Sequence, residues 1–538
     1  MPDYDLILRN GTVYDGSGSP PVAADVAVSG DAIAAVAPLP NARGRVELDA
    51  TGLAVAPGFI NMLSWANETL IEDGRSQSDI RQGVTLEVLG EGRSMGPLND
   101  SMKQEMVEQQ GDIRYNVEWT TLGEYLEFLE RRGVSCNVTS FVGAATLRIH
   151  EIGYDDRPPT PEELARMCAL VRQAMAEGAV GVSSALIYSP AAYARTDELI
   201  ALAKEAAADG GLYASHIRNE ADGLLEALDE FLTIARLAGV KAEVYHLKAS
   251  GRSNWDKLDT VVKTIDNARA EGLPITADMY TYAASSTGLD AVMPPWVQEG
   301  GHKAWVARLR DPNVRARVKT DMNTPSRAWD NGWLSVGSPD KILLVGFKNP
   351  SLKPLAGKTL AEIAAMRGTP PEDTAMDLVI EDDSEVGAVF FVMSEENVTK
   401  KVRCPWMSFC SDARSLAPEG VFLKRNTHPR AYGSFARVLG KYVRDEQVIP
   451  MEEAVRRLAA LPAANLGLDR RGLLAPGHFA DVVAFDPAAI RDNATYKEPH
   501  QYATGMVHVV VNGTPVLRDG DHTGATPGRF VRGPGRRE

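Results

Sequence analysis

Cysteine is scarce in this chain, which has only four cysteines among 538 residues: Cys136, Cys168, Cys404 and Cys410. They are widely spaced, and no two of them form a CxxC pair. This pattern favours neither a disulfide framework nor a structural zinc knuckle. A reducing compartment is therefore the default, and we expect a cytoplasmic protein.

Long apolar runs and an excess of basic charge are also missing. No run approaches the ~20 residues that a membrane-spanning helix needs, and the first residues carry Asp3 and Asp5 where a signal peptide is basic. Lys and Arg total 57 against 72 Asp and Glu, a formal net charge of −15. An acidic surface disfavours nucleic acid and anionic membranes as partners. With 44% hydrophobic residues, the chain is typical of a soluble globular protein, and we expect a small-molecule substrate.

The two ends of the chain resemble each other in pattern. Short alternating runs interrupted by Gly, Asn and Asp occupy residues 4–56, and the stretches GHFADVVAFD and HVVVNGTPVLRDG near the other end are similar. Such runs are typical of small antiparallel strands joined by tight turns. We predict that residues 1–56 and 466–538 join in one small β-sandwich.

Between these ends, apolar runs alternate with helical stretches such as TPEELARMCALVRQAMAEG, in which apolar residues recur at intervals of three and four. Parallel strands need crossover connections, and eight of them close a packed ring. The sequence therefore predicts a (β/α)8 barrel, with strands one to seven in residues 57–289 and the last strand and helices in residues 401–465. The eight expected strand segments are PGFINM, VTLEVLG, NVTSFVG, VGVSSAL, GLYASH, AEVYHL, PITADMY and WMSFCSD.

The connection between the seventh and eighth expected strands is too long for a loop. It runs from Tyr280 to about Pro405 and contains the helical stretch TLAEIAAMRG. Connections of this length usually carry structure of their own. We predict an inserted subdomain over residues 290–400 that sits over the barrel mouth.

Three polar residues end buried strands of the expected barrel. His216 ends one in YASHIRNE, His246 another in EVYHLKASG, and Asp412 a third in WMSFCSDARS. A lone histidine at a strand end is more often structural than a ligand. Two histidines and an aspartate at the carboxyl ends of barrel strands, however, are the arrangement with which barrel hydrolases hold a divalent metal and a proton carrier.

Several motifs, in order over nearly the whole chain, resemble the N-acyl-D-amino-acid deacylases, the D-aminoacylase branch of the amidohydrolase superfamily. The resemblance implies a metal-dependent barrel hydrolase with a small β-sandwich that cleaves the amide of N-acyl-D-amino acids. It also implies that His216 and His246 are zinc ligands and that Asp412 exchanges protons with the attacking water as general base and acid. The residues that it places at the substrate carboxylate are Lys248, Tyr280, Ser286 and Arg430. The motifs are APGFI, SHIRNE, YHLKASG, DMYTYAASST, SDARS, HPRAYGSFARVLG and LPAANLGLDRRGLLAPGHFADVVAFDP.

The chain departs from the family after its first barrel strand. Family members usually carry a His-x-His pair shortly after PGF, whereas Leu63 and Trp65 stand there in this chain. Neither side chain ligates zinc, so we expect the second, weaker metal site of the family to be missing, with Asn67 only a distant substitute. Leu63 and Trp65 together would form an apolar wall, which predicts a hydrophobic acyl group or side chain on the substrate.

A second departure concerns the cysteine that family members carry in a Gly-Asn-Cys-Gly turn after the second strand. The corresponding turn here reads GEGRSMGP, and Glu91 is its only strong ligand. A carboxylate oxygen binds zinc at about 2.0–2.2 Å. We therefore predict one zinc per chain, held by Glu91, His216 and His246 with an open position for water. The alternative is that Glu91 faces solvent or caps a helix.

Several other polar residues near these motifs could have either a structural or a functional role. Arg218 and Glu220 could contact the substrate or lie behind the metal ligands, but we expect them to form a solvated ion pair at the start of a helix. His428 either relays protons or fixes the turn that aims Arg430. Tyr188 and Tyr193 either line the barrel mouth or pack within their loop.

Two other functions stay open from the sequence. One is a different amide hydrolase on the same barrel, such as a dipeptidase, a hydantoinase-like or a lactamase-like enzyme, because fold and metal do not fix the substrate. The other is a barrel that has lost catalysis and binds a ligand or partner chain. The presence of His216, His246 and Asp412 argues against the second, since a scaffold has no physical need of them.

Overall fold

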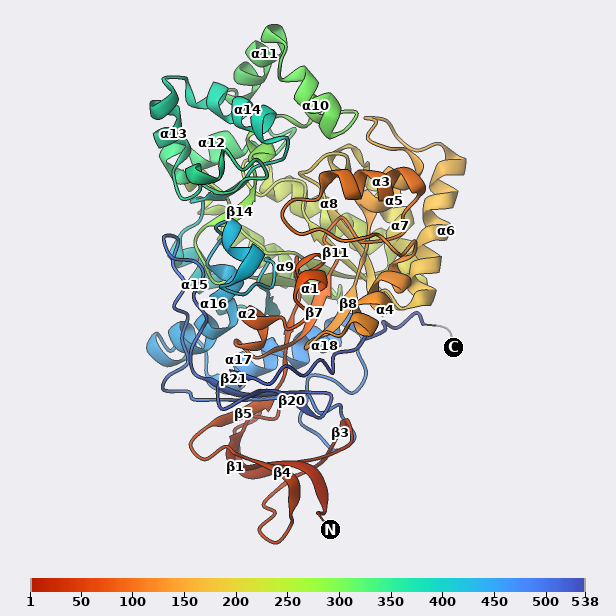
Figure 1. Ribbon diagram of the computed structural model, residues 1–538. Helices are drawn as coiled ribbons and strands as arrows, with labels where there is room; N and C mark the ends of the chain where they lie inside the picture. Colours follow the sequence, from red (N-terminus) through yellow and green to blue (C-terminus); the bar gives the residue numbers. More distant parts are fainter. Residues whose placement is uncertain (1, 537–538) are drawn as a thin grey trace.

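A ring of parallel strands forms the centre of the computed structural model, which describes residues 2–536 (Figure 1). Two parallel sheets build it, one of β6, β7 and β8 and the other of β9, β10, β11, β12, β13 and β17. A single residue, Phe141, separates β8 from β9, and a bridge between Ser64 and Ala413 links the other two edges. The sheets are thus compatible with a (β/α)8 barrel. The strands are β6 (Phe59–Asn61), β7 (Val84–Leu89), β8 (Asn137–Ser140), β9 (Val142–Gly143), β10 (Gly181–Ala185), β11 (Leu212–His216), β12 (Lys241–Val244), β13 (Ile275–Met279) and β17 (Met407–Phe409).

The eight predicted segments account for these strands, NVTSFVG covering both β8 and β9, and helices connect most of them. The helix predicted from TPEELARMCALVRQAMAEG is α6. Its N-cap Thr160 accepts a hydrogen bond from the backbone of Glu163, and its C-cap Gly178 has the positive φ of 113° that glycine adopts most easily. The helices of the barrel region are α1 (Thr69–Glu72), α2 (Gln77–Ile80), α3 (Asp100–Gln109), α4 (Leu122–Arg132), α5 (Ala144–Glu151), α6 (Pro161–Glu177), α7 (Thr196–Ala208), α8 (Leu224–Ala238), α9 (Lys257–Ala270), α15 (Glu395–Val402), α16 (Arg430–Arg437), α17 (Met451–Leu458) and α18 (Ala460–Leu466).

The two ends of the chain meet in a mixed sheet at the bottom of Figure 1. Strand β18 from the C-terminal part pairs antiparallel with β5 from the N-terminal part, with Ala484 opposite Val55. Valine and leucine side chains of both parts share one buried core there. The remote segments therefore join as expected in one sheet, while their status as a separate domain stays a prediction. Its strands are β1 (Tyr4–Val13), β2 (Val22–Ser29), β3 (Ala32–Ala37), β4 (Gly44–Asp49), β5 (Ala54–Pro57), β18 (Val482–Phe485), β19 (Met506–Val511), β20 (Thr514–Arg518) and β21 (Asp521–His522).

The long connection between β13 and β17 carries an antiparallel sheet and several helices, at the top of Figure 1. The sheet begins with β14 at Ser285, before residue 290, at which the sequence places the start of the insertion. Residues of this region, including Ser335 and Glu385, line the same cavity as His216, so the region forms part of the cavity wall, while its place as a subdomain over the barrel mouth stays a prediction. Its elements are β14 (Ser285–Gly288), β15 (Ile342–Gly346), β16 (Gly387–Phe390), α10 (His302–Arg308), α11 (Pro312–Met322), α12 (Gly332–Val336), α13 (Leu360–Arg367) and α14 (Pro371–Asp382).

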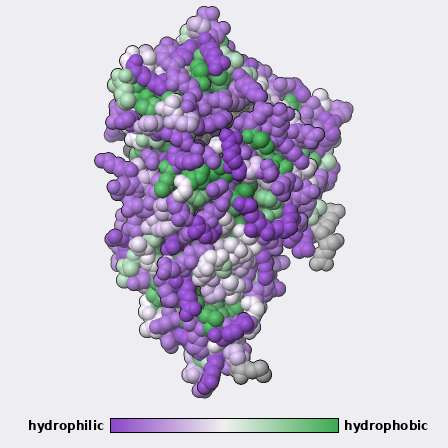
Figure 2. Space-filling model, in the orientation of Figure 1, coloured by the Kyte–Doolittle hydropathy of each residue, from purple (hydrophilic) through white to green (hydrophobic). Residues whose placement is uncertain are grey.

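The surface and the cysteines agree with the composition. On the face that Figure 2 shows, hydrophilic residues dominate and hydrophobic ones occur in small groups. Among residues 2–536, no helix combines the length and apolar character that a bilayer crossing requires. The four cysteines all lie in the described part of the chain, where they are free and buried. The expectation of no disulfide framework is therefore confirmed for that part.

Candidate metal centre

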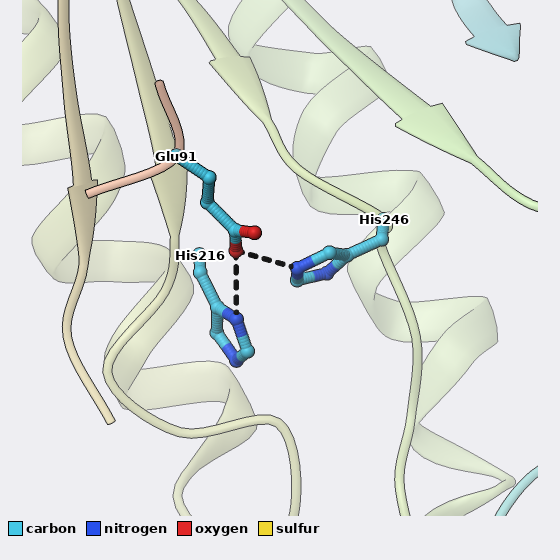
Figure 3. Close-up of side chains that lie close together, drawn as sticks. All are labelled: Glu91, His216 and His246. Atoms are coloured by element: carbon cyan, nitrogen blue, oxygen red, sulfur yellow. Dashed lines mark hydrogen bonds and ion pairs between the residues drawn. The ribbon is translucent and has the colours of Figure 1, made fainter. Parts of the chain in front are cut away.

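Glu91, His216 and His246 converge at the carboxyl ends of three barrel strands (Figure 3). Glu91 follows β7 by two residues, His216 is the last residue of β11, and His246 follows β12 by two. Their side chains are 3%, 4% and 3% exposed, and one potential ligand atom of each lies within 4.8 Å of the others. The three residues that the sequence predicts as metal ligands are thus brought together in the protein interior.

The distances within this triad suit a tetrahedral ion. One carboxylate oxygen of Glu91, Oε1, lies 3.2 Å from Nδ1 of His216 and 3.0 Å from Nε2 of His246, and Figure 3 shows it facing both rings. Ligands about 2.0–2.1 Å from a tetrahedral ion lie about 3.3 Å from one another. Two imidazole nitrogens and a carboxylate oxygen are also a donor set that zinc accepts, with a fourth position left for water or substrate. The residues present therefore fit a divalent metal ion.

Glycine on both sides of Glu91 shapes the turn that carries it. Gly90 and Gly92 have φ of 96° and 61°, a region that other residues rarely adopt. A Cβ added to Gly90 would lie 2.4 Å from the backbone oxygen of Phe141, and one added to Gly92 would lie 2.6 Å from Cβ of Ala185. The Gly-Glu-Gly turn therefore packs closely against the neighbouring strands and points Glu91 inward. It does not face solvent, which was the alternative to the ligand interpretation.

His246 and Asp412 both have strained backbones. Their φ angles of 33° and 47° are unusual for residues with a side chain, and such strain is held where the surroundings demand it. The backbone N–H of His246 donates to Oδ1 of the buried Asp278 at 2.7 Å, and that of Asp412 donates to the carbonyl oxygen of Leu63 at 2.9 Å. These bonds hold the two functional side chains at the mouth of the barrel.

Glu220 lies behind both histidines, which the sequence allowed as the less favoured alternative, and the expected solvated ion pair with Arg218 is wrong. Instead of pairing with Arg218 in solvent, Glu220 is buried, and its Oε1 lies 3.2 Å from Nδ1 of His246 and 2.5 Å from Nζ of Lys248. Its Oε2 lies 3.4 Å from Nε2 of His216. Arg218 instead makes a bidentate pair with Glu230 at 2.7 and 2.9 Å. The signal that could have identified Glu220 is its position four residues after His216.

A carboxylate behind a ligating histidine fixes which ring nitrogen carries the proton. Two groups face Nδ1 of His246: Oε1 of Glu220, which can accept a proton from it, at 3.2 Å, and Nζ of Lys248 at 2.7 Å. A proton on Nδ1 leaves the lone pair of Nε2 free for a metal. The backbone of Glu220 is itself held by the inserted region, because its N–H donates to Oδ2 of Asp330 at 2.7 Å. The insertion thus contributes to the order of the candidate metal centre.

The charge of the site favours a cation. Burial alone would raise the pKa of Glu91, but its hydrogen bonds with His216 and His246 hold it well below its usual range. Burial would lower the pKa of His216, but Glu220 and Glu91 raise it to about 9. The two carboxylates that stabilise a proton on His216 would stabilise a divalent cation by the same electrostatics.

Asp412 lies between two donors on the other side of the cavity. The indole Nε1 of Trp65 donates to its Oδ1 at 3.2 Å, and Nη1 of Arg430 lies 2.6 Å from its Oδ2. Burial raises the pKa of Asp412, and the charge of Arg430 opposes this shift. A carboxylate with a raised pKa is a better acceptor of a proton than an exposed one, which suits a general base.

Of the four residues predicted at the substrate carboxylate, Arg430 and Lys248 lie over the ring of Tyr280, and the carbonyl of Ser286 accepts from Nη2 of Arg430 at 3.1 Å. Cζ of Arg430 lies 4.5 Å and Nζ of Lys248 5.9 Å from the centre of this ring. Within residues 2–536, the hydroxyl of Tyr280 and Nε of Arg430 have no hydrogen-bond partner, while Nη1 of Arg430 pairs with Asp412. Ser286 lies on β14 and donates to the carbonyl of Ala388 at 2.9 Å. All four line one cavity with Asp412 and the candidate metal ligands.

Leu63 and Trp65 do not form a shared apolar wall, as the sequence led us to expect. Leu63 is 1% exposed and packs in the hydrophobic core. Among the described residues, Trp65 lines the cavity, whereas Leu63 and Asn67 do not. Trp65 presents a polar N–H to Asp412. The prediction of a hydrophobic substrate group therefore loses one of its two supports.

His428 has the structural role that the sequence allowed. Its Nδ1 accepts from the backbone N–H of Arg430 at 2.9 Å, and its Nε2 donates to the carbonyl of Ala284 at 3.0 Å. His428 thus fixes the turn that aims Arg430. Tyr188 lines the cavity and its ring packs edge-on against that of His216, at 5.4 Å between centres, whereas Tyr193 lines a neighbouring cavity.

The cavity that contains these residues has a volume of about 640 Å³. Pockets for drug-sized ligands span roughly 300–1,000 Å³, so a small substrate fits. Loops after most of the barrel strands and the inserted region contribute to its wall, and the candidate metal centre lies within it.

Comparisons with known proteins agree with this geometry. The model of a family described as the amidohydrolase family matches residues 418–517. A D-aminoacylase of Alcaligenes xylosoxydans xylosoxydans is 33% identical, with 98% of this chain and 97% of the relative covered. A crystal structure of N-acyl-D-glutamate deacylase from Bordetella bronchiseptica, complexed with zinc and a phosphonate mimic of the reaction tetrahedral intermediate, has a TM-score of 0.80, 32% identity and coverage of 98% and 99%. A D-aminoacylase structure concerned with a binuclear metal center, with one-metal activation and second-metal attenuation, has a TM-score of 0.81, 32% identity and coverage of 98% and 100%.

Proposed function

Because the chain belongs to the D-aminoacylase family of amidohydrolases, we propose that it hydrolyses the amide bond of N-acyl-D-amino acids. The relatives are deacylases, which act on carbon–nitrogen bonds other than peptide bonds. The observation that carries the proposal is the buried triad of Glu91, His216 and His246 in one cavity with Asp412.

Glu91, His216 and His246 would hold one Zn²⁺. The ion would polarise the scissile carbonyl and make water a better nucleophile at neutral pH. The donor set and its distances support zinc, and the replacement of a histidine pair by Leu63 and Trp65 supports a single ion. Glu220 would orient both imidazoles by accepting or balancing their protons.

Asp412 would take a proton from the attacking water and then deliver it to the leaving nitrogen. An amide nitrogen leaves readily only when it is protonated, so one group that performs both transfers shortens the reaction sequence. The burial of Asp412, its raised pKa and its place in the cavity support this role. Trp65 and Arg430 would keep its two oxygens fixed while the proton moves.

The free carboxylate of the substrate would bind at Arg430 and Tyr280, because Nε of Arg430 and the hydroxyl of Tyr280 have no hydrogen-bond partner in the described residues. Lys248 and Ser286 would also donate to this carboxylate. Lys248 already pairs with Glu220, and the hydroxyl of Ser286 already donates to the carbonyl of Ala388. Since Arg430 also pairs with Asp412, its loss should affect turnover as well as substrate binding.

Metal content and substrate range test the function. The purified protein, dialysed against zinc and then freed of excess metal, is expected to hold about one zinc per chain and to release acetate from N-acetyl-D-leucine faster than from N-acetyl-L-leucine. A dipeptide and a hydantoin serve as competing substrates, because a barrel of this kind does not fix the substrate. Faster hydrolysis of either, or the absence of hydrolysis from a folded, zinc-loaded protein, would refute the proposal.

A further inference from the structure

Two arginine side chains, Arg414 and Arg425, line the cavity of the candidate metal centre without a carboxylate of their own. Arg414 follows Asp412 by two residues and is exposed, and Arg425 follows the short helical turn Gly420–Lys424 and is half-buried. Within residues 2–536, neither guanidinium has a hydrogen-bond or salt-bridge partner, and Nε of Arg425 is fully buried without one. A buried donor without an acceptor is costly unless a ligand supplies the acceptor.

Three carboxylates act on Arg425 through their charge, and each of them bonds to another group. Asp112 accepts two bonds of 2.6 Å from Nζ of Lys353. Glu68 accepts from the hydroxyl of Tyr115 at 2.9 Å. Asp382 accepts from the backbone N–H groups of Lys348 and Asn349, in the loop after β15, at 3.0 and 2.9 Å. None of these carboxylates neutralises Arg425 by direct contact in the described structure.

Burial and, to a smaller extent, the positive charge of Arg414 together lower the pKa of Arg425 to about 10. The two cations therefore oppose each other in the free protein. An anion between them would relieve this repulsion and satisfy the buried donor, whereas a neutral ligand group would do neither.

The fold holds these groups in place. The carbonyl of Arg425 accepts from Nε2 of His500 at 2.8 Å, and Nδ1 of that ring lies 3.1 Å from the hydroxyl of Tyr432. A Cβ added to Gly346, at the end of β15, would lie 3.6 Å from Nε, Cζ and Nη2 of Arg425, so the guanidinium lies against the inserted sheet. Its position is thus set by both the barrel and the insertion.

Apolar side chains line the cavity beside the two arginines, namely Leu416, Val421 and Phe422. An aliphatic chain packs well on such residues, and a carboxylate at its end would meet the guanidinium groups. An aliphatic diacid therefore matches this part of the cavity better than a purely hydrophobic group does.

We propose that Arg414 and Arg425 form an anion-binding subsite that receives a second carboxylate of the substrate, carried on an aliphatic chain and remote from the scissile amide. This inference rests on the proposed function for its substrate but on separate residues for its geometry. The second carboxylate belongs either to an acidic side chain or to a dicarboxylic acyl group, and a matched pair of substrates distinguishes the two sources.

The first pair is N-acetyl-D-glutamate and N-acetyl-D-glutamine, and the second is N-glutaryl-D-leucine and N-pentanoyl-D-leucine. In one of the two pairs, the native protein should have a higher kcat/KM for the acidic substrate than for the neutral one. Arg425→Gln should lower the ratio of these two kcat/KM values roughly 10- to 100-fold, because it removes a charged hydrogen bond. The change should lie mainly in KM. Arg414→Gln should lower the ratio less, since Arg414 is more exposed. Lys348→Gln is the matched control, because Lys348 lines the same cavity but lies 3.5 Å from Oδ2 of Asp383.

The inference fails if the native protein prefers neither acidic substrate, or if Arg425→Gln and Arg414→Gln lower both members of a pair equally. Circular dichroism and zinc content establish that each variant is folded and loaded. If the native protein hydrolyses none of the four compounds, calorimetry with glutarate separates the two proposals. If the native protein binds glutarate and the double variant Arg414→Gln/Arg425→Gln does not, the subsite is supported although the proposed function is wrong. If the native protein and the double variant bind glutarate equally or not at all, the subsite is refuted as well.

Discussion

Two groups of residues that line the cavity differ in how their charges are balanced. Around the candidate metal centre, the metal end of the cavity, the cationic side chains of Lys248 and Arg430 each lie against a carboxylate, at 2.5 and 2.6 Å. Arg414 and Arg425 lie without one in the described part of the chain. The difference supports the roles proposed for the two groups, because carboxylates around the metal centre favour a cation there and the unpaired arginines favour an anion.

The largest expected effect comes from removing the cation site itself. His216→Ala combined with His246→Ala leaves Glu91 without either imidazole, and a single carboxylate does not retain zinc. We expect zinc content near zero and turnover at background, measured by elemental analysis and acetate release. A double variant that keeps its zinc or its turnover would show that these rings are not the ligands.

Asp412→Asn should break catalysis while leaving the metal end intact. Loss of a general base lowers kcat typically 10²- to 10⁴-fold. We expect zinc content to stay near that of the native protein, because Asp412 is not part of the triad. Asp519→Asn, an exposed residue of the end sheet, is the control. A fall of less than 10-fold would assign the proton transfer to another group.

Glu220→Gln tests whether the carboxylate behind the two histidines supports metal binding. A residue behind a metal ligand contributes about 10- to 100-fold to metal affinity, and Glu220 contacts both histidines and Lys248. We expect zinc affinity to fall by that factor in competition with a chelator. The exposed Glu226→Gln should leave it unchanged. If both variants bind zinc as the native protein does, Glu220 does not orient the histidines.

Trp65→Phe should have the smallest effect. It removes the N–H that reaches Oδ1 of Asp412 but keeps an aromatic ring and the charge of Arg430. We expect kcat to fall a few-fold, at most about 10-fold, with KM nearly unchanged, as steady-state kinetics can measure. A loss as large as that of Asp412→Asn would mean that the indole itself takes part in the reaction.

Much of the barrel and its triad could be predicted from the sequence, because local signals specify them. Periodic apolar residues marked helices such as α6, and short apolar runs that end in His216 or Asp412 marked the strands. The Gly-Glu-Gly turn marked Glu91 as a candidate, but its direction depended on packing against Phe141 and Ala185, which are distant in sequence.

The burial of Glu220 could not be predicted, because a charged residue after a strand is usually solvated. Its partners are His246, Lys248 and Asp330, and the last of these comes from the insertion 110 residues later. The same holds for Leu63, whose side chain turned into the core while its carbonyl holds Asp412. Such contacts have no local pattern.

The sequence by itself determined the parallel strands, the helices between them and the residue types that could ligate a metal, because periodicity and strand ends are local properties of the chain. The tertiary structure decided which charges are paired and which are not. Arg430 and Arg425 lie five residues apart in the sequence, yet one meets Asp412 while the other meets no acidic side chain in the described residues. The physical reason is that electrostatic balance depends on distances between remote segments, and only the folded chain sets those distances.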